Sequence, residues 1–435
     1  MIALFNFATN INYLAMLNRV NYFFLFLMLF SPILSFLSLG LLGLESSTSY
    51  FQKILLIYGL FYFFLNWSKL KIPSEIYFLA AYTIYIFIWS FYNGVYEEKG
   101  IANNAFRVNV STLLAIIIIY NTNFSEKFIK ESLFIFKITA FVAAIVTIIQ
   151  VFNYSFLDAN PYYMAGTGRM GDTLTGDLYQ DRRASIFGFV NPNELGLSYI
   201  PLLAVLVGFL IYNKDKSLLF LFLGGVTTFL SNNRYVMIAF IIITFQYYIY
   251  ERNKLKASIK FTFLLVFLII VVSQVLLFFG YDFSDWFYKR LFREGGLQYT
   301  TRYGALVNFL IFFPKAIFFG TGVHLTAEIA RAVAFVGSSQ IHVGYLQHLI
   351  SYGLVGSFLL FGFWFMLAKK LYKTAKVTDY WGSFFAFLVF LWANATLVMY
   401  SIFFYGILFA LIFDKYFQNK YINSNSKQII KSDEK

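Results

Sequence analysis

The chain consists of long apolar runs separated by short polar segments. A helix of about 17 to 25 apolar residues is long enough to cross a hydrocarbon core of roughly 30 Å. Runs of this kind recur along almost the whole sequence and predict twelve transmembrane helices, near residues 22–44, 51–67, 75–93, 106–121, 134–153, 195–213, 217–231, 235–250, 260–280, 353–369, 380–398 and 400–416. We therefore expect an all-α polytopic membrane protein, with residues 1–435 forming a single integral membrane domain.

The composition supports a membrane protein and excludes several kinds of chemistry. Only 13% of the residues are charged and 22% are aromatic, whereas soluble domains carry roughly 25% charged residues. No small-residue cleavage site follows the first apolar run, so we interpret this run as a retained span. Because the chain contains no cysteine, it offers no disulfide, no thiol nucleophile and no cysteine-ligated metal site.

The positions of the lysines predict the orientation of the chain in the membrane. If the N-terminus lies in the cytoplasm, the lysine-rich loops and the C-terminal segment all fall on the cytoplasmic side, as the positive-inside rule requires. By this assignment 19 of the 23 lysines lie in the cytoplasm or at the inner boundary of the membrane. The net charge of +13 is therefore explained by the positive-inside rule and does not indicate a nucleic-acid partner. Both termini are then cytoplasmic, and the Lys/Ser/Asn-rich tail at 418–435 is expected to be disordered.

The arginines follow a different rule. Nine of the 11 arginines lie on the predicted extracytoplasmic side, namely Arg107, Arg169, Arg182, Arg183, Arg234, Arg290, Arg293, Arg302 and Arg331. A guanidinium group binds phosphate or carboxylate through two donors and stays charged when it is partly desolvated. Together these residues indicate an anionic ligand that is bound from the outer side, although each one alone could serve loop solubility or interface anchoring.

Only two loops are long, at 154–194 and 281–352, and both are predicted to be extracytoplasmic. All three histidines, His324, His342 and His348, lie in the second of these loops or at its junction with the next span. A side chain that titrates near neutral pH can act there as a general base. The two loops therefore indicate that the function of the protein faces outward.

A metal site at these histidines is disfavoured. His342 and His348 are six residues apart, which is about 240° around a helix, so they would not share a face. Tyr345 does share a face with His342 and would line the same cleft. The alternative interpretation is that His342 caps an interfacial helix. We expect neither a metal nor another cofactor.

Two further arginines occupy positions where a charge requires an explanation. Arg302 lies in an amphipathic segment that ends at Pro314 and precedes a Gly-Thr-Gly turn, a pattern typical of a helix in the membrane interface. This segment could equally be an interfacial anchor without a ligand. Arg234 follows Ser-Asn-Asn between two apolar runs, where a charge is costly unless it is paired or functional.

Four segments, taken in order, resemble the bacterial O-antigen polymerase and O-antigen ligase superfamily. The resemblance is carried by Arg183, Phe187, Asn191, Pro192, Asn193 and Gly196; by Ser231 and Arg234; by Arg302, Pro314, Gly320 and Gly322; and by His342, Tyr345, Leu346, Gly353 and Gly356. It covers roughly residues 180–360. The resemblance implies a GT-C-like glycosyltransferase in the bacterial inner membrane, with its active site on the periplasmic side.

Two positions depart from the family pattern. Val343 follows the histidine, where the ligase branch usually has Asn, Ser or Gln, and this favours the polymerase branch. Two asparagines stand between Ser231 and Arg234, where the family has the serine and the arginine side by side.

The resemblance implies that the protein joins undecaprenyl-pyrophosphate-linked repeat units into O-antigen or capsule-type polysaccharide. His342 would accept the proton of the acceptor hydroxyl, and Arg302 would stabilise the leaving pyrophosphate. The substrate-binding residues would be Arg182, Arg183, Asn191, Asn193, Arg234 and Tyr345. Candidate protein partners are a chain-length regulator and a flippase. An O-antigen ligase, which transfers the glycan to lipid A-core, and a lipid-linked oligosaccharide flippase or transporter stay open as alternatives.

Overall fold

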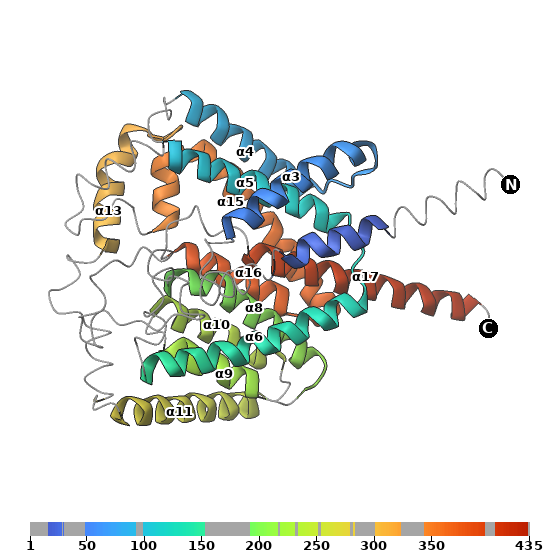
Figure 1. Ribbon diagram of the computed structural model, residues 1–435, viewed down its shortest axis with the longest axis vertical. Helices are drawn as coiled ribbons and strands as arrows, with labels where there is room; N and C mark the ends of the chain where they lie inside the picture. Colours follow the sequence, from blue (N-terminus) through green and yellow to red (C-terminus); the bar gives the residue numbers. More distant parts are fainter. Residues whose placement is uncertain are drawn as a thin grey trace.

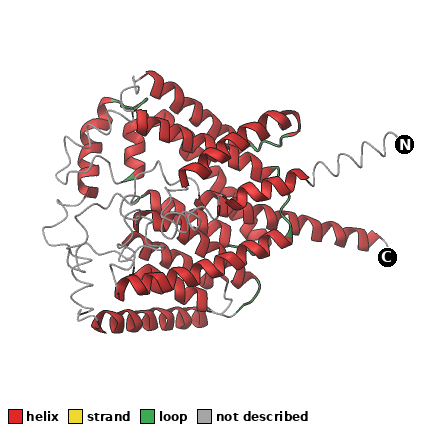
Figure 2. Cartoon of the chain, viewed as in Figure 1, coloured by secondary structure: helices red, strands yellow, loops and turns green. Residues whose placement is uncertain are grey.

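The computed structural model describes residues 16–27, 29, 48–92, 99–152, 192–215, 218–230, 234–250, 254–278, 282, 301–322, 343–395 and 405–433. Within these ranges the chain is helical apart from short turns, and no strand occurs (Figure 2). The predicted all-α fold class is therefore confirmed for this part of the chain.

A helix lies at each predicted apolar run from residue 51 onward (Figure 1). In chain order these helices are α3 (Thr48–Asn66), α4 (Ser74–Tyr92), α5 (Lys99–Tyr120), α6 (Glu126–Phe152), α8 (Pro192–Tyr212), α9 (Leu219–Leu230), α10 (Arg234–Tyr250), α11 (Lys254–Phe278), α15 (Gly344–Thr378), α16 (Gly382–Asn394) and α17 (Tyr405–Asp433). The 3₁₀ turn η2 (Trp67–Lys69) follows α3. Of the first predicted run, residues 22–27 and 29 are described, and they are helical.

Two of the described helices have the length and hydropathy of a membrane span. These are α15 and residues 126–149 of α6, and the latter segment of 24 residues extends about 36 Å at 1.5 Å per residue. Eight further apolar helical segments in the described ranges are shorter, with 10–17 residues each. The structure thus supports a membrane-associated helical protein, and the topology of twelve spans stays a prediction.

The helix α8 lies at the centre of the bundle, where it packs against α16, α10, α17 and α6. Residues 199–208 of α8 are all buried, as is expected of a helix that is apolar on every side. A Cβ atom added at Gly208 would overlap the backbone of Gly382 in α16. Small residues at a crossing allow two helix backbones to approach closely, so this glycine pair sets the tight contact between α8 and α16.

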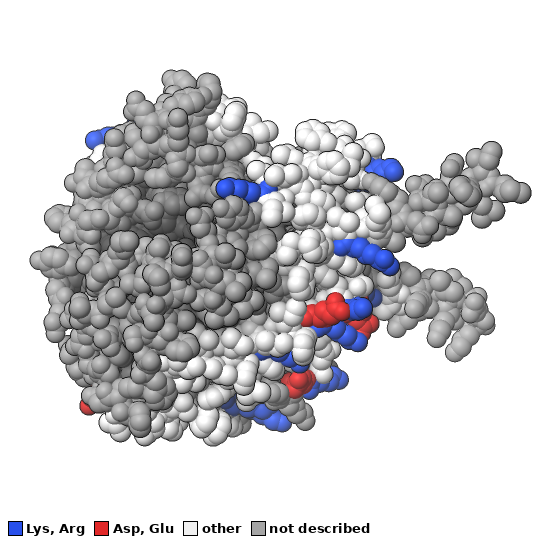
Figure 3. All heavy atoms as spheres, in the orientation of Figure 1, with Lys and Arg blue, Asp and Glu red and all other residues white. Residues whose placement is uncertain are grey.

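Large apolar side chains cover the outer surface of the bundle. Among the most exposed are Ile57, Phe64, Leu255, Phe358 and Phe365, each at least 69% accessible. Water-soluble monomers rarely expose apolar surface on this scale. In the view of Figure 3 most described lysines and carboxylates gather toward the end from which α17 projects. This distribution fits an apolar surface that contacts lipid and a charged end that lies outside it.

Two predicted boundaries differ from the structure. The helix α15 begins at Gly344, nine residues before the predicted span at 353, so the start of this helix belongs to the segment that we expected to be an outer loop. The helix α17 continues to Asp433, although the tail from residue 418 was expected to be disordered. Residues 154–191, 281, 283–300 and 323–342 of the two predicted outer loops lie outside the described residues.

Candidate functional site

The helix α15 is broken at Gly353, and this break is the centre of the candidate site. Gly353 has φ 61° and ψ −164°, a conformation that is essentially restricted to glycine. It divides α15 into a short N-terminal part, 344–352, and a long C-terminal part, 354–378. The N-terminal part is here called the outer half, because it lies in the second predicted outer loop. A break of this kind leaves backbone carbonyl and N–H groups without partners inside the helix.

The polar backbone groups at the break are satisfied by a turn that follows α13 (Thr301–Phe312) and the 3₁₀ turn η5 (Phe313–Lys315). The turn spans residues 317–322 and makes four backbone hydrogen bonds to α15. The donor and acceptor pairs are Thr321 to Ile350 at 2.7 Å, Gly322 to Ser351 at 3.0 Å, Leu354 to Ile317 at 2.8 Å and Val355 to Phe318 at 3.0 Å. Hereafter Gly353 and this turn together are called the α15 break.

Glycine is required on both sides of the α15 break. A Cβ atom at Gly353 would overlap the Phe318 carbonyl, and a Cβ atom at Gly320 would overlap the Ser351 carbonyl. Gly320 and Gly322 also have positive φ values, 78° and 82°, which L side chains rarely adopt. Glycines that lie more than 30 positions apart in the sequence therefore belong to one interlocked piece of backbone.

The helix α4 covers the α15 break, and the sequence did not point to this role. The Tyr85 hydroxyl lies 2.9 Å from the carbonyl oxygens of both Phe319 and Tyr352, so it bridges the inserted turn and the outer half of α15. The Trp89 ring lies next to the Phe319 ring, with centroids 5.6 Å apart. Aromatic residues on one face of an apolar helix are common, which is why this pattern gave no specific signal.

His348 lies in the outer half of α15 and is buried, with 3% of its surface accessible. Its Nδ1 atom lies 3.3 Å from the Tyr82 hydroxyl of α4, and its ring contacts the rings of Tyr352 and Phe361. The Nε2 atom has no hydrogen-bond partner. The histidine that we noted at the edge of the second loop is thus a core residue that joins α15 to α4.

Tyr345, the predicted substrate-binding tyrosine, lies in the first turn of α15 and contacts α16. Its hydroxyl donates a hydrogen bond to the Leu391 carbonyl at 2.7 Å, and its ring packs edge-on against Phe361 and Trp364. In this structure its side chain anchors the start of α15 to α16, and its hydroxyl is already engaged.

The remaining predicted site residues are only partly within the described chain. Arg302 lies in the first turn of α13, Arg234 is the first residue of α10 and Asn193 is the second residue of α8; the structure describes their backbone but not their side chains. Arg182, Arg183, Asn191 and His342 lie outside the described residues.

The helix that carries Arg302 lies beside the outer half of α15. Ala305 of α13 and Ile350 of α15 form a small buried core, with Phe309, Phe313 and Val343 packed against it. Val343 directly precedes α15 and directly follows His342 in the sequence. The structure therefore brings the backbone of the Arg302 helix to the segment that His342 precedes.

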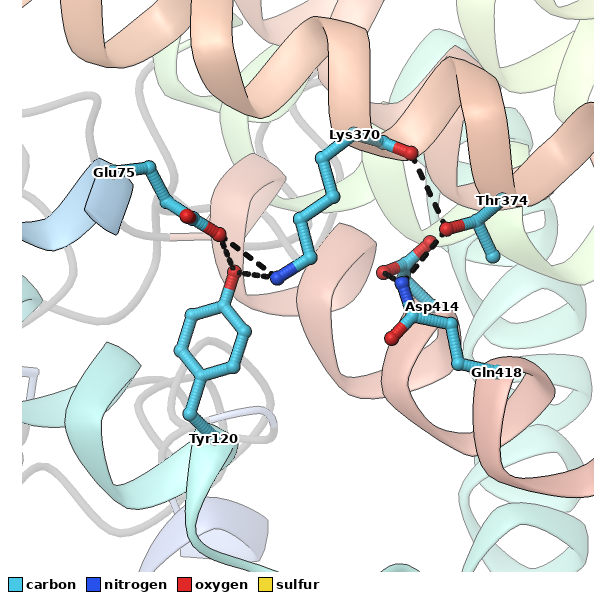
Figure 4. A network of polar contacts seen from close by, with 6 residues as sticks. All are labelled: Glu75, Tyr120, Lys370, Thr374, Asp414 and Gln418. Atoms are coloured by element: carbon cyan, nitrogen blue, oxygen red, sulfur yellow. Dashed lines mark hydrogen bonds and ion pairs between the residues drawn. The ribbon is translucent and has the colours of Figure 1, made fainter. Parts of the chain in front are cut away.

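A second polar site, which the sequence did not reveal, lies where α4, α5 and α15 meet (Figure 4). The Lys370 ammonium lies 2.8 Å from Glu75 Oε1 and 2.5 Å from the Tyr120 hydroxyl, and that hydroxyl donates to Glu75 Oε1 at 2.6 Å. The ammonium also lies 3.9 Å from the centre of the Tyr120 ring. We call Glu75, Tyr120 and Lys370 the ionic cluster.

The helix α17 adds a further carboxyl group next to the ionic cluster. Asp414 is buried, with 2% of its surface accessible, and Gln418 donates to its Oδ2 atom at 3.1 Å and to Thr374 of α15 at 2.8 Å. These residues were hidden in the sequence because each is a single polar residue in or beside an apolar run. Among the described residues no group of three or more histidines or carboxylates is placed to hold a metal ion.

Comparison with known proteins adds no family assignment: no protein-family model and no curated protein sequence matches this chain.

Proposed function

We propose that the protein is a membrane-embedded glycosyltransferase that polymerises undecaprenyl-pyrophosphate-linked oligosaccharide repeat units into O-antigen or capsule-type polysaccharide. The reaction takes place on the periplasmic face of the bacterial inner membrane. The protein crosses this membrane with twelve helices and has both termini in the cytoplasm.

The observation that carries the proposal is the α15 break. The third and fourth segments of the superfamily pattern, one with Gly320 and Gly322 and the other with Gly353 and Gly356, are separated in the sequence but hydrogen-bonded to each other in the structure. Two of these glycines have a physical role here, because Gly320 and Gly353 let two backbone segments meet. Non-helical backbone at the depth of a membrane is tolerated where protein buries it or where it lines a polar cavity.

The proposed chemistry needs a base and a cationic site for a leaving pyrophosphate. The acceptor hydroxyl attacks the anomeric carbon of the growing chain, and the bond from that carbon to the pyrophosphate oxygen breaks. His342 accepts the hydroxyl proton. Arg183, Arg234 and Arg302 bind the pyrophosphates and stabilise the negative charge on the leaving group. Arg182, Asn191 and Asn193 bind and orient the substrate.

The surface of the bundle supports a location in the membrane. Exposed apolar side chains cover the described helices, among them Phe64 at 73% and Phe263 at 68% accessible. The exposed lysines Lys127, Lys130, Lys373 and Lys376 lie at the start of α6 and the end of α15. This pattern fits a cytoplasmic end that carries the positive charge.

An O-antigen ligase is the second candidate function. It would use the same donor site and differ in the acceptor, which would be lipid A-core in place of a lipid-linked repeat unit. Val343 after the proposed base favours the polymerase, because the ligase branch usually has a polar residue at this position.

The proposal is tested by deleting the gene and separating the lipopolysaccharide of the strain on a gel. We expect lipid A-core that bears a single repeat unit, and we expect wild-type protein to restore the ladder while His342→Ala does not. Long polymer that stays on the carrier lipid would instead identify the ligase. An unchanged ladder after deletion, together with an unchanged amount of capsular polysaccharide, would refute both functions.

Two arginine variants sharpen this test. Arg183→Ala and Arg302→Ala should abolish polymer while the protein inserts normally, and Arg183→Lys should rescue poorly because lysine lacks the two-pronged donor geometry. Lys373→Ala, a change at an exposed cytoplasmic lysine, is the matched control and should leave the ladder intact.

A further inference from the structure

The interface between α13 and the outer half of α15 contains two buried amide side chains. Ala305 and Ile350 form the small core of this interface. Asn308 follows Ala305 by three positions and Gln347 precedes Ile350 by three positions, so each amide lies on the same helix face as its core residue. Asn308 is 3% accessible and Gln347 is 7% accessible. An otherwise apolar contact between two helices therefore encloses two polar groups.

Neither amide has a hydrogen-bond partner that compensates for its burial. The Oδ1 atom of Asn308 and the Oε1 atom of Gln347 are buried without a partner, and within the described part of the chain neither side chain forms a hydrogen bond. The buried amide of Gln246 in α10 differs, because its Nε2 atom donates to the Ala204 carbonyl at 3.1 Å. A buried polar group without a partner is unfavourable in free energy and requires an explanation.

The helix α13 is attached to the bundle mainly at one end. Among the described helices its main partner is α15, and it lies at the edge of the bundle (Figure 1). Its outward-facing residues Leu306 and Leu310 are 46% and 62% accessible. The turn 317–322 that follows it is joined to α15 by four backbone hydrogen bonds. The start of α13 can therefore move away from α15 about the α15 break without disrupting the main core of the bundle.

We propose that α13 swings away from α15, and that Asn308 and Gln347 then bind hydroxyl groups of the saccharide in a lipid-linked repeat unit. An amide offers both a donor and an acceptor, as a sugar hydroxyl does, so the two groups match without any charge. A pyrophosphate would instead require cationic donors. This inference rests on the proposed function and names the residues that hold the sugar part of the substrate.

The position of the two amides fits this role. Asn308 lies on the helix that carries Arg302, and Gln347 lies one helical turn after Val343, which directly follows His342 in the sequence. The amides thus lie between the two segments to which the proposed leaving-group and base residues belong. A hydroxyl group that binds them would also relieve their lack of partners in the closed interface.

The first test measures the polymerisation kinetics of the purified full-length protein in detergent. The substrate is the lipid-linked repeat unit isolated from the deletion strain, and the variants are Asn308→Leu and Gln347→Met, which keep the approximate side-chain size. We expect the KM for the repeat unit to rise about fivefold in each variant at similar kcat, as for the loss of one hydrogen bond between neutral groups. Without substrate, each variant should unfold at the same temperature as wild type or higher, because an apolar side chain replaces an unpaired amide.

The control is Gln246→Met, the same substitution at an amide that donates to a carbonyl group. It should unfold at a lower temperature than wild type and keep the wild-type KM. An unchanged KM in Asn308→Leu or Gln347→Met, or a rise in KM together with a lower unfolding temperature, would overturn the inference and leave the proposed function standing. A wild-type protein that does not polymerise the repeat unit would remove the proposed function and the inference with it.

The second test asks whether α13 must move. The native chain contains no cysteine, so Ala305→Cys combined with Ile350→Cys introduces a single pair of thiols at the core of the interface. Oxidation to the disulfide, or closure with a short thiol-bridging reagent, should abolish polymerisation, and reduction of the disulfide should restore it. The single variant Ile350→Cys, treated in the same way, is the control and should stay active. Wild-type activity of the cross-linked protein would show that the interface stays closed during the reaction.

Discussion

The helix α15 is held in two different ways along its length. At the α15 break its partners are backbone groups, which are joined to residues 317–322 by four hydrogen bonds. At the ionic cluster its partner groups are side chains, because Lys370 binds Glu75 and the hydroxyl of Tyr120. The two regions are 17 residues apart, which is about 26 Å along a helix.

The two kinds of attachment depend on different properties of the sequence. The α15 break requires residues that lack a side chain, since a Cβ atom at Gly320 or Gly353 would overlap backbone atoms. The ionic cluster requires matched charges, since removal of one partner leaves the other charge buried. Close backbone packing therefore holds the N-terminal part of α15, and charge compensation holds its C-terminal part.

The largest effect is expected from Gly353→Ala. Alanine is strained at φ 61°, and its Cβ would overlap the Phe318 carbonyl, so the hydrogen bonds of Leu354 and Val355 would be lost as well. We expect a loss of about 4 kcal/mol in the free energy of unfolding, measured by thermal unfolding in detergent. A variant as stable as wild type would show that the α15 break does not require glycine.

Lys370→Met should have the next largest effect. The substitution leaves the buried Glu75 carboxylate without its cation, and removal of one partner of a buried pair costs about 3 kcal/mol. The double variant Lys370→Met with Glu75→Gln should recover part of this loss, because no charge is then left unpaired. Lys373→Met, at an exposed position of the same helix, is the control. No recovery in the double variant would argue against an ion pair.

Tyr85→Phe should destabilise the protein by about 1 kcal/mol. The change removes the hydroxyl that bridges the carbonyl groups of Phe319 and Tyr352, while the ring stays in place. The matched control is Tyr77→Phe on the same helix, where the side chain is 62% accessible. Because Tyr85 belongs to one region and Lys370 to the other, the losses of Tyr85→Phe and Lys370→Met should add in the double variant. A large coupling energy would mean that the two regions act as one.

The smallest effect is expected from Gly304→Ala, and its sign is opposite. Gly304 lies inside α13, and a Cβ atom there would meet nothing within 4 Å. Alanine should therefore stabilise the helix by about 0.5 to 1 kcal/mol. Comparison of this variant with Gly353→Ala distinguishes a glycine that close backbone contact requires from a glycine that alanine can replace. A destabilised variant would show that the surroundings of α13 are tighter than the structure indicates.

The hydrophobic pattern predicted most of the secondary structure. A membrane-length apolar run has few alternatives to a helix, and each predicted run from residue 51 onward contains one. Two helix boundaries were predicted wrongly. The helix α15 starts at Gly344 within a polar stretch, and α17 continues through a polar tail. Polarity alone does not distinguish a helix that leaves the bundle from a loop.

The candidate site was predicted in part. The sequence selected Gly320, Gly322 and Gly353 through a resemblance, but it did not show that these glycines meet. It assigned Tyr345 to substrate binding, which stays a prediction, but it did not show the hydrogen bond from the Tyr345 hydroxyl to the Leu391 carbonyl of α16. It gave no role to Tyr85, because an aromatic residue in an apolar helix has the same pattern whether it faces lipid or another backbone.

Local hydropathy specifies the helical class and the approximate positions of the helices, because both depend on neighbouring residues in the sequence. The partners of the polar residues follow only from the folded structure. Glu75 and Lys370 are 295 positions apart, and residues 317–322 fill a break that lies about 30 residues further along the chain. Contacts of this kind arise from the packing of helices, and no local pattern encodes them.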